Sequence, residues 1–194
     1  YWFHGWSSGS GQTNEFVTVG QANDVITVYP LGMADETEKS PGRNSWNVGD
    51  ANRTNTCTRT TGDVCYTSCR NLNMCSRCNC FTCVDDIAFV RTLIARINEG
   101  YCTDESRLYV GGASNGGMFT YYLAGQIPEL VTGGYLLMCG QPMVGWLNTP
   151  ALAAESYMIS LHGRSDDVLP PAGGVDGDDM WVYESLNNTF YVWG

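Results

Sequence analysis

One serine lies between glycines in residues 107–124, which read RLYVGGASNGGMFTYYLA. The centre of this stretch is Gly112-Ala113-Ser114-Asn115-Gly116, which follows an apolar run and precedes a segment of helical character. Where a chain turns sharply from a strand into a helix, a serine at the turn is held in a strained conformation with its hydroxyl exposed. Glycines on both sides leave room for such a turn, since a Cβ atom there would clash. We predict that Ser114 is a nucleophile for acyl transfer, with a purely structural turn as the alternative.

A serine nucleophile requires an oxyanion hole, in which two backbone N–H groups point at the negative charge that develops on the substrate. The residue after the nucleophile supplies one of them, here Asn115. The loop after an earlier strand supplies the other, and His4-Gly5-Trp6 fits that place, so we predict the N–H of Trp6. We expect His4 to hold this loop by a hydrogen bond, because a residue before the nucleophile does not suit the order serine, acid, histidine.

The acid of such a site follows a later strand, and the segment ISLHGRSDDVLPP supplies two carboxylates there. One carboxylate accepts a hydrogen bond from the catalytic imidazole and fixes its tautomer. We favour Asp166 for this role and place Asp167 second. The alternative is that both residues only cap a turn.

The base is harder to find, because the sequence contains two histidines, His4 and His162. His162 precedes Asp166 by four residues in the same turn, so we expect it to be structural. We therefore expect the catalytic histidine to lie outside these 194 residues, after Asp166 in chain order. The apolar start at residues 1–3 and the helix-like end ESLNNTFYVWG likewise suggest a chain that is incomplete at both ends.

The expected strands and helices place these residues at one edge of a sheet. Strands are predicted at residues 1–3, 25–29, 107–113, 135–138 and 157–161, and helices at 83–100 and 118–125. This alternation predicts an α/β domain with a mainly parallel sheet flanked by helices, and 194 residues fit a single domain, 1–194. Residues 31–82 show little periodicity, and we interpret residues 31–83 as a cysteine-rich loop or insertion.

Charge and cysteines limit the class of protein. The net charge of −10, with 10 basic residues against 20 acidic ones, argues against nucleic acid as a partner. We find no signal peptide and no apolar run long enough to span a membrane. Seven of the nine cysteines lie between Cys57 and Cys83, which favours disulfides and an extracellular protein. Two sequons, at Asn52 and Asn187, suggest glycosylation and agree with secretion.

Two metal sites are weaker alternatives, and we predict no metal. Cys75-x-x-Cys78 and Cys80-x-x-Cys83 have the spacing of zinc half-sites, but the cluster is too crowded for a clean four-ligand site. Asp176, Asp178 and Asp179 lack the spacing and the closing glutamate of a known calcium loop, so a solvated acidic loop is favoured.

Together the motifs FHGW, VYPLG, SWNVG, VDDIAFVRTLI, RLYVGGASNGGM and LHGRSDDVLPP resemble the secreted polyhydroxybutyrate depolymerase and feruloyl esterase family. The resemblance spans essentially the whole chain. It implies the α/β-hydrolase fold of carbohydrate esterase family one, with Ser114 as nucleophile, Asp166 as acid, and Trp6 and Asn115 at the oxyanion hole. It also implies ester hydrolysis through an acyl-enzyme without a cofactor.

The resemblance leaves the substrate open between feruloyl or acetyl esters of plant cell-wall polysaccharide and polyhydroxyalkanoate esters. Trp46 and Trp6 are candidate aromatic residues of the substrate cleft, although a buried core position is the alternative for each. The competing hypothesis for the whole protein is a non-catalytic carbohydrate- or surface-binding protein on a hydrolase scaffold, because the chain lacks the expected histidine.

Overall fold

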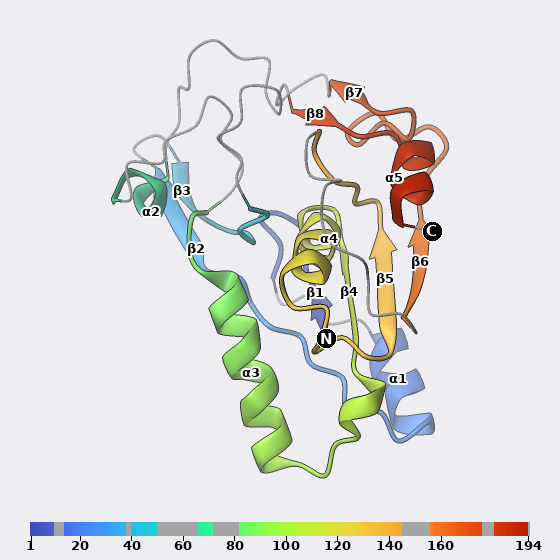
Figure 1. Ribbon diagram of the computed structural model, residues 1–194. Helices are drawn as coiled ribbons and strands as arrows, with labels where there is room; N and C mark the ends of the chain where they lie inside the picture. Colours follow the sequence, from blue (N-terminus) through green and yellow to red (C-terminus); the bar gives the residue numbers. More distant parts are fainter. Residues whose placement is uncertain are drawn as a thin grey trace.

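The centre of the computed structural model is a four-stranded parallel sheet (Figure 1). The structure describes residues 1–9, 14–37, 40–49, 66–71, 82–144, 156–175 and 181–193. The strand order is β1 (Trp2–Phe3), β4 (Tyr109–Ala113), β5 (Gly134–Met138) and β6 (Tyr157–Leu161), and each neighbouring pair is parallel. The carboxyl ends of parallel strands lie at one edge of the sheet, so the residues after β4, β5 and β6 lie near one another.

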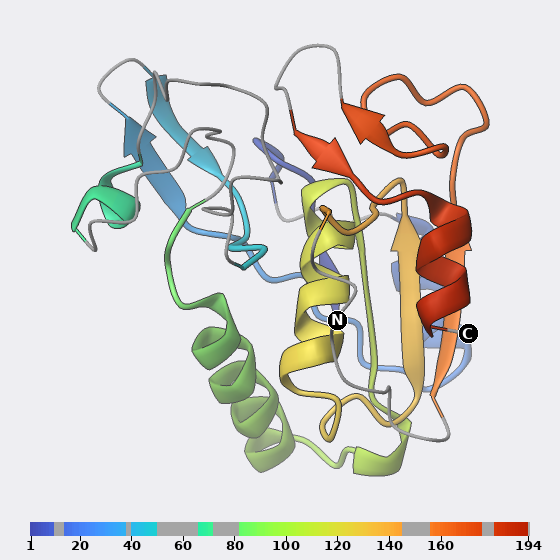
Figure 2. The same ribbon diagram turned by 45° about the horizontal axis from the view of Figure 1, so that its top comes forward.

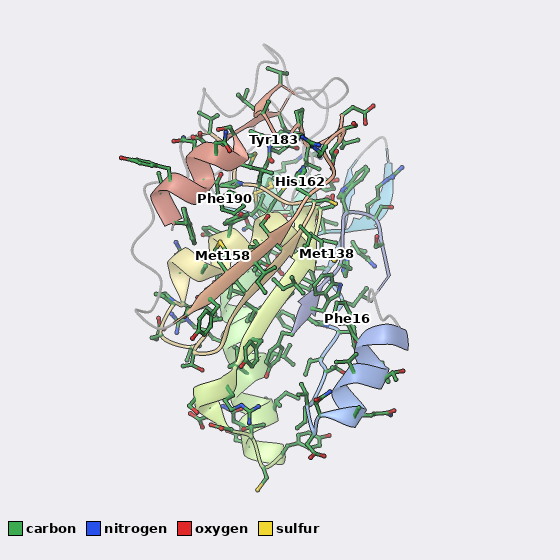
Figure 3. All side chains as sticks on the ribbon, turned by 90° about the vertical axis from the view of Figure 1, so that its right-hand side faces the viewer. Phe16, Met138, Met158, His162, Tyr183 and Phe190 are labelled. Atoms are coloured by element: carbon green, nitrogen blue, oxygen red, sulfur yellow. A yellow bond between two sulfur atoms is a disulfide. The ribbon has the colours of Figure 1, made fainter. Side chains whose placement is uncertain are left out.

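Helices cover both faces of this sheet. Helix α4 (Asn115–Gln126) and helix α5 (Leu186–Trp193) lie on one face, and α1 (Asn14–Ala22) lies on the other. Figure 3, which views the sheet from its side, shows this division. Helix α3 (Asp86–Gly100) lies beside α4, and Figure 2 shows the two adjacent. The prediction of an α/β fold with a mainly parallel sheet and flanking helices is therefore confirmed.

Local sequence explains α3, the longest described helix. The side chain of Asp85 caps its first turn by accepting a hydrogen bond from the N–H of Ala88 (3.0 Å). Val90 and Ile94, four residues apart, are buried on the face turned to the core. The N–H of Tyr101 closes the other end by donating to the carbonyl of Ile97 (3.0 Å). The helix predicted at residues 83–100 is thus present, beginning three residues later.

Aromatic rings fill the core between the sheet and these helices. The ring of Phe3, on β1, meets the rings of Trp46 and Phe119 edge-on, at centroid distances of 5.1 and 4.9 Å. Trp46 and Phe119 are stacked at 5.3 Å. Such aromatic pairs stabilise the folded protein by more than the burial of their surface area alone. They join β1, the segment after β3 and helix α4, which are the elements around Ser114.

Several sequence predictions are wrong in detail. No strand forms at residues 25–29, where the chain runs beside β1 without a regular series of ladder bonds: the N–H of Trp2 donates to the carbonyl of Val28 (2.9 Å), and the N–H of Val25 turns back to the carbonyl of Gly20 (2.9 Å). Residues 31–82 are more regular than predicted. They contain the antiparallel strands β2 (Ala34–Thr37) and β3 (Ser40–Asn44) and the short helix α2 (Thr67–Asn71). The strand sequences ADET and SPGRN carry no alternating apolar pattern, so the sequence gives no sign of this hairpin.

Other small elements were not predicted either. They are helix α1, the 3-10 turn η1 (Glu105–Arg107), and the strands β7 (Gly174–Val175) and β8 (Val182–Tyr183). A two-residue strand is too short to show a periodicity. The β2–β3 and β7–β8 ribbons both lie at the carboxyl end of the sheet (Figures 1 and 2).

The cysteines support disulfides over zinc where the structure describes them. Cys69 is disulfide-bonded to Cys83, so the second proposed zinc half-site is wrong, because Cys83 is not a free thiolate. Cys102 and Cys139 are free thiols. The remaining five cysteines lie outside the described residues, as do Asn52 and the acidic residues Asp176, Asp178 and Asp179. Within the described ranges, no group of three or more His, Cys, Asp or Glu side chains is arranged to hold a metal ion.

Among the described residues, no helix combines the length and the apolar character that crossing a membrane requires.

Candidate active site

Ser114 lies at the junction where β4 ends and α4 begins. Its backbone angles are φ 53° and ψ −121°, in the left-handed half of the conformational map that residues other than glycine rarely adopt. Two backbone bonds hold it there: its N–H donates to the carbonyl of Met138, and its carbonyl accepts from the N–H of Met118, both at 2.9 Å. The sharp strand-to-helix turn predicted around Ser114 is present, and α4 begins directly after it, at Asn115 rather than at Met118.

The glycines near Ser114 have a steric reason. A Cβ atom on Gly116 would lie 2.1 Å from the carbonyl oxygen of Phe3, and one on Gly112 would lie 2.4 Å from the carbonyl of Gly116. Real Cβ atoms do not approach backbone atoms this closely. The two glycines therefore let the first turn of α4 pack against the ends of β1 and β4.

The loop after β1 lies against the serine. A Cβ atom built on Gly5 would be 3.4 Å from the Cβ atom of Ser114, so the loop and the serine are in van der Waals reach. Two hydrogen bonds of the His4 ring hold this loop. Its Nε2 accepts from the N–H of Gly32 (2.9 Å), and its Nδ1 donates to the carbonyl of Gly5 (2.7 Å). Burial lowers the pKa of His4, which keeps the ring neutral. The expectation that His4 is structural is confirmed.

The predicted oxyanion donors are the backbone N–H groups of Trp6 and Asn115. The amides of Ser7 and Ser8 are occupied by the carbonyls of Asn44 (2.8 Å) and Gly5 (3.2 Å), whereas the N–H of Trp6 has no partner among the described residues. The N–H of Asn115 belongs to the first turn of α4, where helical bonding leaves donors unpaired. The positive end of the helix dipole adds to its pull on an anion. The role of this pair as oxyanion donors stays a prediction.

The side chain of Asn115 has a structural task. Its Oδ1 accepts from the N–H of Trp46 (2.8 Å) and its Nδ2 donates to the carbonyl of Trp46 (3.2 Å). The indole N–H of Trp46 in turn donates to the carbonyl of His4 (3.0 Å). Trp46 therefore connects, from within the core, the start of α4 at Asn115 to the loop after β1 at His4. Its side chain is 0 % exposed, so the prediction that Trp46 lines the substrate cleft is corrected.

Trp6 is placed differently from Trp46. It is 37 % exposed, its indole N–H donates to the hydroxyl of Tyr66 (3.3 Å), and the guanidinium of Arg43 lies over its ring. Its ring is thus partly exposed at the surface, and its place in a substrate cleft stays a prediction. The contacts of Trp46 and Arg43 were missed from the sequence, since they join residues that are far apart along the chain.

Asp166 lies in the turn after β6. Its Oδ1 accepts from the N–H groups of Val168 (3.1 Å) and Leu169 (2.9 Å), so one oxygen does cap the turn. Its Oδ2 is 3.5 Å from Nε2 of His162, and that nitrogen donates to the carbonyl of Leu169 at 2.7 Å. His162, labelled in Figure 3 beyond the end of β6, thus closes the turn as a structural residue. Among the described residues no backbone N–H donates to Oδ2, and Asp167 is exposed beside it. The role of either carboxylate as the acid stays a prediction.

The strand order relates the two candidate catalytic groups. Ser114 follows β4 and Asp166 follows β6, with β5 between them. Two strand spacings amount to about 10 Å, which leaves room for an imidazole between the side chains. Neither His4 nor His162 makes a hydrogen bond to the hydroxyl of Ser114.

One of the two predicted glycosylation sites lies among the described residues. Asn187 is exposed on α5, while Thr189 of the same sequon is buried and donates to the carbonyl of Ser185 (2.9 Å). Asn52 lies outside the described residues. Glycosylation at both positions stays a prediction.

Comparison with characterised proteins gives one partial similarity. Over 84 residues the chain is 31% identical to a bifunctional acetylxylan esterase/xylanase from Neocallimastix patriciarum. The match covers 43% of this chain and 12% of that protein, so the chain spans a small part of the relative's length. No protein-family profile matches the chain, and no solved structure does. The similarity is consistent with a relation to carbohydrate esterases.

Proposed function

We propose that this protein is a serine esterase that hydrolyses carboxylic esters attached to a polysaccharide. The observation that carries the proposal is the conformation of Ser114, strained at φ 53° in a strand-to-helix turn, with the Gly5 loop packed against it. Strain of this kind persists where the surrounding packing enforces it, and it is concentrated at functional sites. The similarity to an acetylxylan esterase/xylanase supports the substrate class.

The proposed mechanism assigns each group a role. The hydroxyl of Ser114 loses its proton to a histidine and attacks the ester carbonyl, and the N–H groups of Trp6 and Asn115 stabilise the oxyanion. The alcohol leaves with the proton from the histidine. Water, activated by the same base, then releases the acid and restores the serine. Oδ2 of Asp166 accepts from the imidazole throughout. The histidine itself stays a prediction, expected after Asp166 in chain order.

The finer assignment follows the resemblance found in the sequence. Within the α/β-hydrolase fold we propose a secreted enzyme acting on acetyl or feruloyl esters of plant cell-wall polysaccharide, with polyhydroxyalkanoate esters as the other substrate class. The Cys69–Cys83 disulfide supports the extracellular location, because disulfides persist mainly in oxidising compartments.

Substitution of the serine tests the proposal. We expect the full-length protein to hydrolyse p-nitrophenyl acetate and acetylated xylo-oligosaccharides, and Ser114→Ala to reduce kcat about 10³-fold or more. Ser106→Ala, at an exposed serine of η1, is the matched control and should keep its activity. Hydrolysis that is unchanged in Ser114→Ala would rule out the esterase assignment. Methyl ferulate and polyhydroxybutyrate, assayed in parallel, decide between the substrate classes.

A second candidate is a carbohydrate-binding protein without catalysis. It is favoured by the absence of a hydrogen bond between Ser114 and either histidine of the chain. In that case the wild-type protein would bind xylo-oligosaccharides in calorimetry but hydrolyse none of the esters.

A further inference from the structure

Arg43 lies on strand β3, next to the loop that carries Trp6. Its Cζ atom is 4.5 Å from the centroid of the Trp6 ring, and its Nη1 lies 3.5 Å from the hydroxyl of Ser7. The neighbouring Asn44 fastens the same loop, because its carbonyl accepts from Ser7 and its side-chain amide donates to the carbonyl of Ser8 (3.3 Å). The β2–β3 hairpin therefore holds a guanidinium at a fixed place beside the proposed oxyanion loop.

Among the residues that the structure describes, this cation has no carboxylate partner. Arg91 and Arg96, on helix α3, pair with Glu129 and Glu99 at 2.8 and 2.9 Å. In contrast, no carboxylate of the described chain lies within ion-pair distance of Arg43.

The carboxylate opposite Arg43 in the hairpin register binds other groups. Asp35 is the cross-strand partner of Arg43, but its Oδ2 accepts from the hydroxyls of Ser68 and Thr82, the latter at 3.0 Å. Its Oδ1 is 3.4 Å from the N–H of Ser68. The described hydrogen bonds of Asp35 thus lead to Ser68 and Thr82, and none is made to Arg43.

Stacking on Trp6 leaves the guanidinium ready to bind an anion. A guanidinium that lies over an aromatic ring keeps its N–H donors in its own plane, where they match the two oxygens of a carboxylate. The ring also restricts the side chain, so less entropy is lost on binding. The loop that presents Trp6 reaches Ser114, since Gly5 lies within van der Waals reach of the serine.

We propose that Arg43, held by Trp6, forms a subsite for a carboxylate on the substrate. The preferred substrates are esters of polysaccharides whose sugars include a uronic acid near the esterified position. This inference rests on the proposed esterase function. It identifies an acidic polymer as the substrate class, although the protein itself is strongly acidic.

A pair of substrates tests the subsite. Acetylated xylo-oligosaccharides with a glucuronic acid branch are compared with neutral ones of equal length and acetylation. We expect the wild-type protein to prefer the acidic substrate in kcat/KM, and Arg43→Gln to lower the acidic-to-neutral ratio about tenfold, the worth of one charge-assisted hydrogen bond. Arg43→Lys, which keeps the charge but loses the planar fork, should lie between the two. The preference should weaken as salt is raised.

The controls separate a subsite from a structural role. Arg96→Gln removes a charge on α3 and should leave the ratio unchanged. If Arg43 only supported Trp6, Arg43→Gln would lower kcat/KM for both substrates equally, and the subsite would be rejected. A wild-type protein without preference for the acidic substrate would reject it too. Thermal denaturation of each variant shows whether it is folded.

Binding without turnover distinguishes this inference from the proposed function. Calorimetry with the unacetylated acidic oligosaccharide is performed on Ser114→Ala, with and without Arg43→Gln. Binding that Arg43→Gln weakens about tenfold supports the subsite even if no ester is hydrolysed. If esters are hydrolysed but neither binding nor kcat/KM depends on Arg43, the esterase function stands and the subsite is rejected.

Discussion

Gly116 shows how tightly single residues are fitted around Ser114. A Cβ atom at this position would meet two backbone oxygens, at 2.1 Å for Phe3 and 2.5 Å for His4. Backbone atoms cannot swing away as the end of a flexible side chain can, so relief requires that β1 or α4 moves. Because β1 leads directly into the loop with Trp6, such a shift would also displace the proposed oxyanion hole.

Gly116→Ala is therefore expected to reduce both stability and activity. Overpacking of this kind typically costs about 1–3 kcal/mol in the free energy of unfolding, which chemical denaturation measures. Ester hydrolysis should fall by more than the unfolded fraction explains. Gly100→Ala is the control. Gly100 is the last residue of α3, a Cβ atom added there would meet no other atom within 4 Å, and alanine favours a helix. Equal stabilities of the two variants would contradict the close packing at Gly116.

At the residue scale, the turn around Ser114 was predictable because its environment is local. Ser114, its glycines and Asp166 lie in short motifs in which strand, turn and helix follow one another. Trp46 could not be placed, because its position depends on Asn115, 69 residues away. A tryptophan between polar residues suits a cleft as well as a core, and only the three-dimensional contacts decide between them.

Helix α3 carries a buried carboxylate in its first turn. Asp86 accepts from the N–H of Asn47 (2.6 Å), and this bond attaches the helix to the segment after β3. Desolvation raises the pKa of Asp86 to about 6, with repulsion from Asp85 adding to the rise and the bond from Asn47 opposing it. Because the pKa of Asp86 is higher in the folded protein than in the unfolded chain, the free energy of unfolding depends on pH.

The sign of that dependence follows from the direction of the shift. The folded protein binds the Asp86 proton more tightly than the unfolded chain, so the stabilisation is fully present below about pH 4 and is lost as pH rises through about 6. Relative to wild type, Asp86→Asn should therefore gain stability between pH 4 and 7, on the order of 2 kcal/mol. Asn retains an oxygen that accepts from Asn47.

Urea denaturation of both proteins at pH 4, 5, 6 and 7 measures this difference. Asp24→Asn, which removes an exposed carboxylate, is the matched control. The same pH dependence in wild type and Asp86→Asn would show that Asp86 does not change protonation on unfolding.

At the scale of elements, strong periodicity decided what was predictable. Helix α3 and strands β4, β5 and β6 have clear apolar patterns and were found within a few residues of their bounds. The β2–β3 hairpin was not predicted, because its strands lie away from the main sheet and need no alternating apolar face. The β-branched run at residues 25–29 has strand propensity, but it runs beside β1 with too few ladder bonds to form a strand.

At the scale of the whole molecule, the parallel sheet meets the β2–β3 hairpin and helix α2 at its carboxyl edge. The alternation of strands and helices made the sheet predictable, whereas the packing of the described residues within 31–83 depends on contacts between distant residues. Asp35 on β2 binds Ser68 and Thr82, and the hydroxyl of Ser68 accepts from the N–H of Cys83 (2.8 Å). The disulfide Cys69–Cys83 closes the same cluster. This cluster connects the hairpin with Arg43 to the start of α3.

The disulfide should therefore affect the site as well as stability. Replacing Cys69 and Cys83 together by alanine frees a loop of about 15 residues in the unfolded chain, which costs about 3 kcal/mol. Because the hairpin holds the Trp6 loop through Arg43 and Asn44, we also expect kcat/KM for p-nitrophenyl acetate to fall in the folded variant. Cys102→Ala removes an exposed free thiol and should change stability by less than about 0.5 kcal/mol. If the double variant lost stability but kept full kcat/KM, the cysteine-rich segment would stabilise the molecule without shaping its site.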